Sequence, residues 1–470
     1  MTLDHHDNKK TNTDDDNKKG FGLRVAIIGA GITGVILALG LERRGVEYVV
    51  YERNPSFAEL GAGIGFSPNA ERALGLIGPE VYAAYKRITP PPSAEPDYFT
   101  WVDGVRTNEV VARLLIGVDA FQGGRRSEFL DAWSAMIPRA KVRFGKEILN
   151  LKERGSDGMV ELVFRDGSVE EADLVIGCDG IRSRVRQVML GEDNPASRAT
   201  YTHKFCFRSL IPMSRAQAVL GAERVGRRFM YNGPGAHCIT YPVARDTLLN
   251  ALFVISDNNN DNKASSSSGW THQKLTAPGK KEEVVQAFRE WHPVVRALVD
   301  LLPEEDSGRL DKWALFDMFE YPAEKFNVGA TCLAGDAAHA AGPHLGSGAG
   351  FGVEDALVLA SILEAADKRV VELGRDGGLK GKGEGKARRV KICHDALEAY
   401  NEARFDRDQW LPGATREAVE LFQGTDEEVA RDPDTYLPRV TRLYHEIWDM
   451  DVGKMVADAV AGFERRVEGV

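Results

Sequence analysis

Apolar and polar positions follow different patterns in different regions of the chain. Residues 24–28 and 48–51 are short apolar runs of the kind that forms buried strands, and a longer amphipathic segment separates them. Residues 172–177 form another such run. A strand, a helix and a second strand in succession predict a parallel βαβ unit. A later helix is expected to open at residue 125, with Ser127 as its cap.

Residues 200–320 have a different pattern. Strand-like runs follow one another with short breaks between them, at 201–210, 228–231, 237–242 and 248–255. Such a series predicts a mostly antiparallel sheet. The polar, low-complexity stretch 257–269 predicts a surface loop.

The first pattern returns further along the chain. Residues 326–364 have the order strand, glycine-rich loop and helix. A Lys/Gly-rich stretch within 365–389 predicts a solvated insertion, and the spacing of apolar positions in 392–470 predicts helices. The chain is therefore expected to leave its first unit, form the sheet, and come back.

Composition excludes several classes of protein. The net charge of −10 argues against a nucleic-acid binder, and no apolar run reaches the ~18 residues of a membrane span. Residues 1–20 are polar, which predicts a disordered tail and not a secretory signal. The five cysteines show no pairing pattern, which is typical of a reducing compartment. We therefore expect a cytoplasmic protein without a transmembrane segment.

Three glycine-containing motifs carry the candidate chemistry. Gly29, Gly31 and Gly34 directly follow the first strand, and the second strand ends at Glu52. These glycines allow a tight turn, close approach to a pyrophosphate and close helix packing. The carboxylate of Glu52 can accept hydrogen bonds from ribose hydroxyls. The second motif is residues 178–186, CDGIRSRVR, and the third is residues 335–348, GDAAHAAGPHLGSG. The first motif predicts a dinucleotide site.

Taken together, the motifs resemble the single-component FAD-dependent aromatic hydroxylases, in particular salicylate-hydroxylase-like monooxygenases of the fungal type. The resemblance covers about residues 24–412. It implies a family DG motif at Asp179, a GD motif at Asp336 that meets the ribityl–pyrophosphate region, and an arginine over the flavin nucleotide at Arg126. The predicted cofactor-binding residues are Gly29, Ala30, Gly31, Gly34, Glu52, Arg53, Gly65, Arg126, Asp179, Asp336, Pro343, Gly346, Gly348 and Ala349.

The expected fold class is α/β. A Rossmann-like FAD-binding domain is interrupted by a mostly antiparallel β-sheet substrate domain and followed by a helical C-terminus. The expected divisions are a tail at 1–20, the FAD-binding domain at 21–199 and 323–364, the substrate domain at 200–322, and the insertion with C-terminal helices at 365–470.

The family resemblance implies non-covalent FAD, transient use of NADPH or NADH, and a flavin C4a-hydroperoxide that hydroxylates an aromatic substrate with O₂. A phenol reacts faster when ionised, so a cation or strong donor should lie beside it. The resemblance places Arg208 and Tyr241 at the positions of an arginine and a tyrosine that contact the phenolate in fungal enzymes of this type. His344 lies in the flavin loop. Structural roles for all three residues stay open. The family often has glutamine where this chain has Leu345, so salicylate is not assigned as substrate.

The expected function is NAD(P)H-dependent monooxygenation of a phenolic small molecule, with dearomatisation and decarboxylation both open. The alternatives are a flavin oxidase or dehydrogenase and a non-catalytic flavin-binding protein. No set of His, Cys and carboxylate residues has metal-ligand spacing, so no metal is expected. The choice between NADH and NADPH, the substrate, and the choice between monomer and homodimer stay open.

Overall fold

The computed structural model describes most of the chain. The predicted disordered tail at 1–20 lies outside the described residues, and so do residues 258–269 of the surface loop predicted at 257–269. The described residues are 22–57, 63–90, 96–117, 121–155, 157–257, 270, 272, 274–303, 310–376, 383–424 and 432–469.

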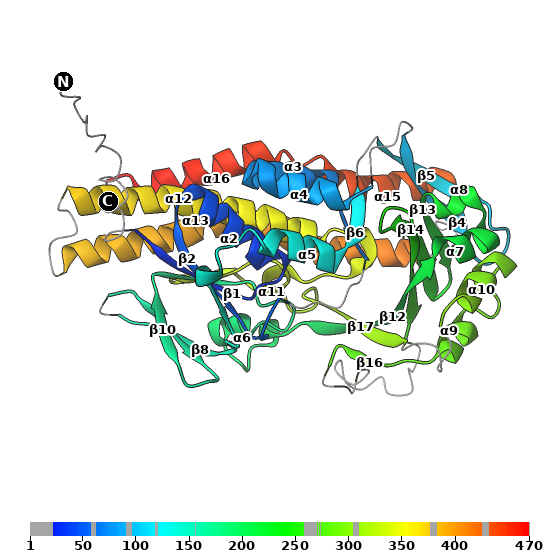
Figure 1. Ribbon diagram of the computed structural model, residues 1–470, viewed down its shortest axis with the longest axis horizontal. Helices are drawn as coiled ribbons and strands as arrows, with labels where there is room; N and C mark the ends of the chain where they lie inside the picture. Colours follow the sequence, from blue (N-terminus) through cyan, green and yellow to red (C-terminus); the bar gives the residue numbers. More distant parts are fainter. Residues whose placement is uncertain are drawn as a thin grey trace, which may run out of the picture.

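A six-stranded sheet forms one end of the molecule (Figure 1). Its central strands are apolar and buried, and all neighbours are parallel except the pair at the β18 edge. Continuous apolar strands are expected where a parallel sheet is covered on both faces. In order across the sheet, the strands are β18 (Asn327–Val328), β19 (Thr331–Leu333), β11 (Leu174–Gly177), β1 (Arg24–Ile28), β2 (Glu47–Glu52) and β7 (Val142–Phe144).

Helices cover this sheet and supply most of its core. Figure 1 shows three long helices, α12, α13 and α16, running side by side above the sheet, and α12 packs against α2 and α3. The helices of this half are α2 (Ile32–Arg44), α3 (Pro68–Ile77), α4 (Pro79–Ile88), α5 (Arg126–Ser134), α6 (Arg184–Leu190), α11 (Asp336–His339), α12 (Gly348–Arg375), α13 (Glu384–Phe422) and α16 (Val452–Val467).

An eight-stranded sheet forms the other end (Figure 1). All of its neighbours are antiparallel except β13 and β4. Across the sheet the strands are β16 (Thr276–Pro278), β17 (Asp311–Asp317), β12 (Thr200–Pro212), β15 (Leu248–Ser256), β14 (Ala236–Val243), β13 (Arg228–Gly233), β4 (Asp97–Asp103) and β5 (Val110–Gly117).

Both faces of the eight-stranded sheet are packed. Short helices cover one face, and the second half of α13 with α15 packs on the part of the other face near β4 and β5. The remaining helices are α7 (Met213–Leu220), α8 (Ala222–Val225), α9 (Lys281–Ala287), α10 (Pro293–Asp300), α15 (Pro433–Trp448), and the 3₁₀ turns η1 (Arg139–Lys141), η2 (Pro195–Ser197) and η3 (Pro343–Leu345).

Two small sheets complete the fold. A three-stranded antiparallel sheet lies beside the parallel one, and a two-stranded ribbon lies between the two large sheets. Their strands are β8 (Ile148–Glu153), β9 (Val160–Phe164), β10 (Val169–Ala172), β3 (Gly63–Phe66) and β6 (Gln122–Arg125).

The structure confirms the α/β fold class and corrects four local predictions. Ser127 does not cap α5, because the helix already begins at Arg126. The run 172–177 is two strands, since β10 ends at residue 172 and β11 begins at 174. Residues 365–375 continue α12 as helix before the Lys/Gly-rich stretch. The large sheet also takes in β4 and β5, which the range 200–322 leaves out.

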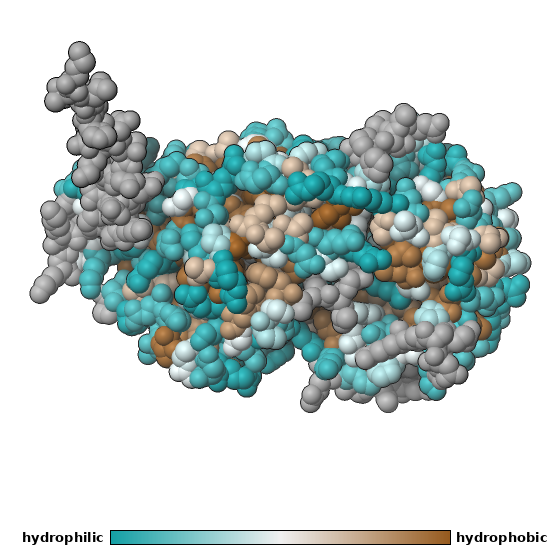
Figure 2. Space-filling model, viewed as in Figure 1, coloured by the Kyte–Doolittle hydropathy of each residue, from teal (hydrophilic) through white to brown (hydrophobic). Residues whose placement is uncertain are grey.

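The outer surface is mixed in character. On the face shown in Figure 2, hydrophilic groups predominate and hydrophobic groups form small separate areas. None of the described helices combines the length and the apolar composition that a membrane crossing requires.

Candidate active site

The first glycine loop joins β1 to α2. Gly29 has a φ of +101°, and a Cβ there would lie 2.5 Å from the carbonyl oxygen of Cys178. A Cβ on Gly34 would overlap the carbonyl oxygen of Gly29, which fits the tight packing of α2 on this loop. A Cβ on Gly31 would meet no protein atom within 4 Å. Gly31 therefore opens onto free space at the N-terminus of α2, where backbone amides can bind phosphate.

Glu52 lies at the end of β2, beside this loop. Its Oε2 accepts the backbone N–H of Ala30 at 2.8 Å, and its Oε1 accepts that of Asn54 at 2.8 Å. An ionised carboxylate has about four acceptor positions, so two remain for the hydroxyls of a ribose. The following residue, Arg53, is exposed.

The second motif forms a turn before α6. The Asp179 carboxylate accepts hydrogen bonds from the Ser183 hydroxyl at 2.5 Å and from the Arg184 backbone N–H at 2.6 Å. Burial raises the pKa of Asp179 although these bonds act against it. Asp179 thus stabilises its own turn, which holds Gly180 at the junction of the cavities described below.

Arg186 ties the second motif to the third. Its side chain is fully buried, and its guanidinium donates to the carbonyl oxygens of Ala337 and Ala338 at 3.0 and 2.8 Å. A third bond goes to the carbonyl oxygen of Ala196 at 2.6 Å. One buried arginine therefore links α6 to α11, which carries the GD motif.

The third motif brings two glycine turns close to the first. Gly335 has a φ of +62°, and a Cβ there would overlap the Thr33 hydroxyl. Gly346 has a φ of +63° at the end of η3. A side chain would strain the backbone at both positions. Asp336 begins α11 directly after the first of these turns.

Two connected cavities run along these motifs. The nucleotide cleft, of about 640 Å³, is bounded by the first glycine loop, Glu52, Arg126 and the second motif. The inner cavity, of about 310 Å³, is bounded by the third motif and the eight-stranded sheet. Gly31, Arg126, Cys178 and Gly180 line both. A long bent cavity with a phosphate cradle at its middle fits an extended FAD molecule.

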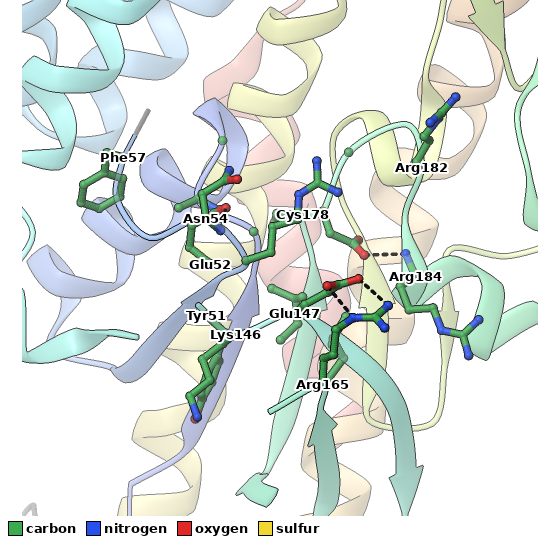
Figure 3. Close-up of a pocket in the computed structure, with 18 of the residues that line it drawn as sticks. Tyr51, Glu52, Asn54, Phe57, Lys146, Glu147, Arg165, Cys178, Arg182 and Arg184 are labelled. Atoms are coloured by element: carbon green, nitrogen blue, oxygen red, sulfur yellow. Dashed lines mark hydrogen bonds and ion pairs between the residues drawn. The ribbon is translucent and has the colours of Figure 1, made fainter. Parts of the chain in front are cut away.

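Figure 3 shows the nucleotide cleft from inside, with Glu52 and Asn54 on one wall and Arg182 across from them. Burial lowers the pKa of Arg182, and the neighbouring positive charge of Arg53 lowers it further. At the lower end of the cleft, Glu147 pairs with Arg165 at 2.7 and 2.8 Å. Basic side chains outnumber acidic ones in the lining of this cleft, which suits phosphate groups.

The predicted residues converge on these cavities. Every predicted cofactor-binding residue except Gly34 lines at least one of them, and Gly34 packs behind the loop. The three predicted catalytic residues, Arg208, Tyr241 and His344, all line the inner cavity. Their roles in catalysis stay predictions.

Arg208 and Tyr241 share one face of the eight-stranded sheet. Arg208 on β12 pairs with Leu252 on β15, and Leu252 pairs with Ile239 on β14. Tyr241 lies two residues beyond Ile239 on the same strand. Side chains two residues apart on a strand point to the same face. Burial raises the pKa of Tyr241 although Arg208 and Arg228 act against it, so the phenol stays protonated and can donate.

Arg228 is a further cation on the wall of the inner cavity, besides Arg126 and Arg208, and sequence reasoning missed it. It is buried, ion-paired to Asp97, and donates to the Phe121 carbonyl oxygen at 2.5 Å. Burial lowers its pKa to about 10. In contrast, no carboxylate among the described residues forms an ion pair with Arg208; its guanidinium instead lies 5.9 Å from the centre of the Trp313 ring.

His344 lies on the opposite wall, in η3. Burial lowers its pKa to about 3, and Lys204 contributes to the decrease. Its ring meets that of His237 nearly edge to face, with the ring centres 5.4 Å apart. At neutral pH His344 is therefore an uncharged imidazole. Tyr444 of α15 also lines the cavity, so the C-terminal helices contribute to it.

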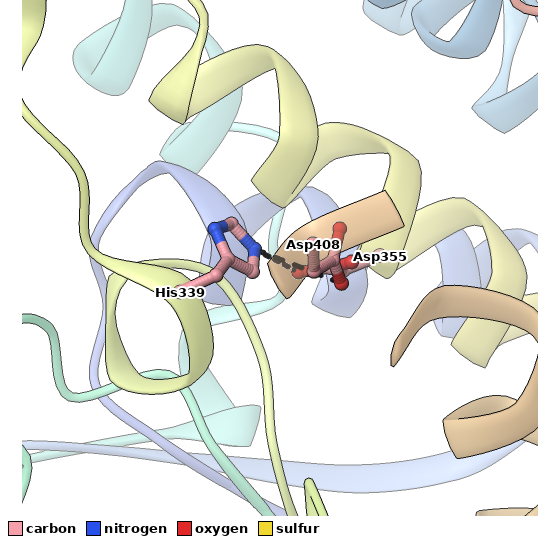
Figure 4. A group of neighbouring side chains, drawn as sticks. All are labelled: His339, Asp355 and Asp408. Atoms are coloured by element: carbon pink, nitrogen blue, oxygen red, sulfur yellow. Dashed lines mark hydrogen bonds and ion pairs between the residues drawn. The ribbon is translucent and has the colours of Figure 1, made fainter. Parts of the chain in front are cut away.

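Behind the third motif lies a buried ion cluster, which Figure 4 shows in part. Arg404 of α13 donates to Asp355 at 2.8 Å, to Glu354 at 2.5 Å and to Asp408, and all four side chains are fully buried. Asp355 also accepts from the Gly335 backbone N–H and contacts His339 Nε2, both at 2.8 Å. The cluster thus holds the GD turn against α12 and α13.

The cluster includes three residues whose side chains can bind a metal ion. Ligand atoms of His339, Asp355 and Asp408 lie within 4.8 Å of one another. Arg404 contacts both carboxylates at bonding distance, and His339, whose pKa is raised to about 9, supplies a second positive charge beside them. A divalent cation here would therefore add charge to a balanced site. We interpret the group as structural.

His339 should make the stability of the fold depend on pH. Burial favours a lower pKa, but Asp408 and Asp355 outweigh it and raise the pKa of His339 from 6.5 to about 9. A raised pKa adds stability below pH 6.5 that is lost as pH rises through about 9. We expect the free energy of unfolding to decrease over this range by roughly 1–3 kcal/mol. Urea titrations from pH 6 to 10 should show a smaller decrease for His339→Gln, while the exposed control His445→Gln should match the parent.

Comparisons with known proteins agree with this geometry. Residues 124–369 match the family model described as an FAD binding domain. The chain is 43% identical to the FAD-dependent monooxygenase pigN of Monascus ruber, with 95% of this chain and 98% of that protein covered. It is 37% identical to the salicylate hydroxylase asL1 of Sarocladium schorii, with 95% and 92% covered. A salicylate hydroxylase substrate complex superposes with a TM-score of 0.76 at 26% identity, covering 93% and 98%.

Proposed function

The chain belongs to the FAD-dependent monooxygenases of the salicylate hydroxylase type, and we propose that it uses NAD(P)H and O₂ to hydroxylate a phenol. The phenol would lie in the inner cavity, between the eight-stranded sheet and the third motif. The observation that carries this proposal is Arg208, a cation on the cavity wall with no carboxylate partner among the described residues.

The chain's own residues would prepare the substrate. FAD, when bound, supplies hydride acceptance from NAD(P)H and activation of O₂ at the flavin C4a position. Arg208 would stabilise the phenolate, because a nearby positive charge favours ionisation. Tyr241, kept protonated by burial, would donate a hydrogen bond to the same oxygen or its neighbour. Its position between Arg208 and Arg228 on the sheet supports this role.

His344 would act as a neutral hydrogen-bonding group. A general base works best with a pKa near the working pH, and the pKa of His344 is about 3. We therefore propose that His344 orients the substrate or the oxygen that it gains, and that the substrate's proton leaves by another route.

Transient use of NAD(P)H fits the sequence, which offers one dinucleotide motif. The sequence contains no second glycine motif of the dinucleotide type. The reductant would approach the nucleotide cleft near Arg53 and Arg182, two cations in its lining that attract phosphate groups.

The test is a panel of phenols assayed for NAD(P)H oxidation and product mass under ¹⁸O₂. The proposal predicts one ¹⁸O atom in the product and no flavin reduction by substrate alone. Flavin reduction by a substrate without NAD(P)H would identify an oxidase or dehydrogenase and refute the proposal. Loss of CO₂ would mark decarboxylative hydroxylation, and a non-aromatic product would mark dearomatisation.

Replacing Arg208 should reduce turnover without loss of FAD. Arg208→Ala removes a charge-assisted hydrogen bond worth about 1.5–3 kcal/mol, or roughly 10- to 150-fold in kcat/KM. The bound phenol's pKa should rise, so the pH profile should shift to higher pH. Arg208→Lys restores charge without the planar fork and should recover activity in part. These expectations are checked by measuring kcat/KM as a function of pH and, separately, the flavin content per chain. Normal turnover of Arg208→Ala at neutral pH would exclude Arg208 from the mechanism.

A further inference from the structure

A line of hydrogen-bonded side chains leads from the edge of the sheet to the inner cavity. Lys204 on β12 donates to the Ser256 hydroxyl on β15 at 3.0 Å, and Ser256 donates to Gln423 Oε1 at 2.7 Å. Gln423 Nε2 lies 3.3 Å from His237 Nδ1 on β14. The His237 ring then contacts His344. None of these groups except His344 belongs to the site described above.

The chemistry of the first residue gives every bond in this line a direction. A lysine ammonium only donates, so the Ser256 oxygen must accept from Lys204. The Ser256 proton is then directed to Gln423, whose carbonyl oxygen accepts it. This fixes the orientation of the amide and turns its NH₂ group towards His237. His237 Nδ1 must therefore accept, and the ring proton must lie on Nε2.

The surroundings keep this arrangement in place. Gln423 and His237 are about 2% and 1% exposed, so neither can exchange its bond for one to bulk water. Gln423 is the C-cap of helix α13, and its backbone N–H donates to the Val419 carbonyl oxygen at 2.9 Å. Phe422 packs against His237 with ring centres 5.6 Å apart. Glu420 and Arg416 on α13, His237 on β14 and His344 in η3 are the charged and titratable groups near Lys204.

We propose that Lys204, Ser256, Gln423 and His237 form a directed hydrogen-bond chain that holds His237 in its Nε2–H form and thereby orients His344. The four are positioning residues, because none of them lines the inner cavity. This inference rests on the proposed function only for the contact between His344 and substrate. The direction of the chain follows from the donors and acceptors alone.

Nitrogen NMR of the FAD-loaded protein, labelled with ¹⁵N-histidine, tests the direction without any substrate. We expect His237 to carry its proton on Nε2 and to have an unprotonated Nδ1. The signals of this ring are assigned as those that disappear in the His237→Gln variant. Gln423→Glu keeps the shape of the side chain, but a carboxylate can only accept. In that variant Nδ1 of His237 should gain a proton. Lys204→Met, at a half-buried position, should leave a mixture of both forms.

The matched control is Gln409→Glu, on the same helix. Gln409 Nε2 donates to the Ala323 carbonyl oxygen at 3.0 Å and takes no part in the directed hydrogen-bond chain. It should leave the His237 signals unchanged. A proton on His237 Nδ1 in the parent protein, or unchanged His237 signals in Gln423→Glu, would overturn the proposal.

Kinetics separate this inference from the proposed function. Gln423→Glu should keep its FAD and lower kcat/KM for the phenol on the order of tenfold, the size of one lost hydrogen bond. Normal kcat/KM with an altered His237 would overturn the positioning role. If the parent protein converts no phenol although His237 has the expected form, the proposed function fails and the directed chain stands.

Discussion

A Gly31→Asp variant is expected to fold normally and to purify without flavin. Gly31 is the N-cap of α2, and a Cβ there meets no protein atom within 4 Å. Aspartate is favoured at N-caps, so the apoprotein should lose no stability. Its carboxylate would occupy the place where helix amides meet the pyrophosphate, and like charges repel. We expect flavin absorbance per chain to fall to near zero while the circular dichroism spectrum stays unchanged.

Gly155→Asp is the control for the added charge. Gly155 is exposed in the turn between β8 and β9, and a Cβ there also meets nothing within 4 Å. This variant should retain full flavin. If Gly31→Asp retains full flavin as well, the loop between β1 and α2 does not bind the pyrophosphate, and the assignment of the nucleotide cleft is wrong.

The second large effect is expected at Arg404. Arg404→Met leaves Glu354, Asp355 and Asp408 buried without the guanidinium that contacts all three. Removal of one partner from a buried ion pair costs about 3–5 kcal/mol. In Arg404→Met, Asp355 keeps its contact with His339 and Glu354 keeps its contact with Arg407. Asp408 is the carboxylate that loses its hydrogen-bond donor. We expect a loss of this size in the free energy of unfolding, measured by urea denaturation. Since Asp355 holds the Gly335 N–H, FAD affinity should decrease too.

Arg442→Met tests whether any lost ion pair has this effect. Arg442 on α15 pairs with Glu417 on the surface, where such a pair contributes about 0–1 kcal/mol. Arg404→Lys keeps the charge but not the planar fork and should lie between the parent and Arg404→Met. A loss below about 1 kcal/mol in Arg404→Met would show that the cluster does not hold the helices together.

The sequence predicted the features that depend on short stretches of chain. The positions of Gly29, Gly31 and Gly34 follow from one turn and the start of one helix, so spacing alone locates them. Arg208 and Tyr241 came from family resemblance, and the structure places both on one wall of the inner cavity. The predicted ends of several strands differ from the observed ends by one or two residues, because pairing with neighbouring strands extends them.

The features that sequence could not predict depend on contacts between distant segments. Arg228 follows another arginine and resembles a surface charge, but the pairing of β13 with β4 buries it beside Asp97. Tyr444 reaches the cavity because α15 packs on β5 and its neighbours, which no local pattern encodes. Arg404 forms its ion cluster with Glu354 and Asp355, which lie some fifty residues earlier in the chain.

The order in which the wall residues of the inner cavity occur along the chain has a consequence for synthesis in the cell. Gly31 and Arg126 emerge from the ribosome early, Arg208 and Tyr241 later, and the 335–349 motif and Tyr444 later still. A nascent chain that contains only the first glycine loop can offer FAD a phosphate-binding loop but lacks the other walls of the inner cavity. Tight loading of the cofactor should therefore follow translation past Tyr444, when all walls of the inner cavity have been synthesised.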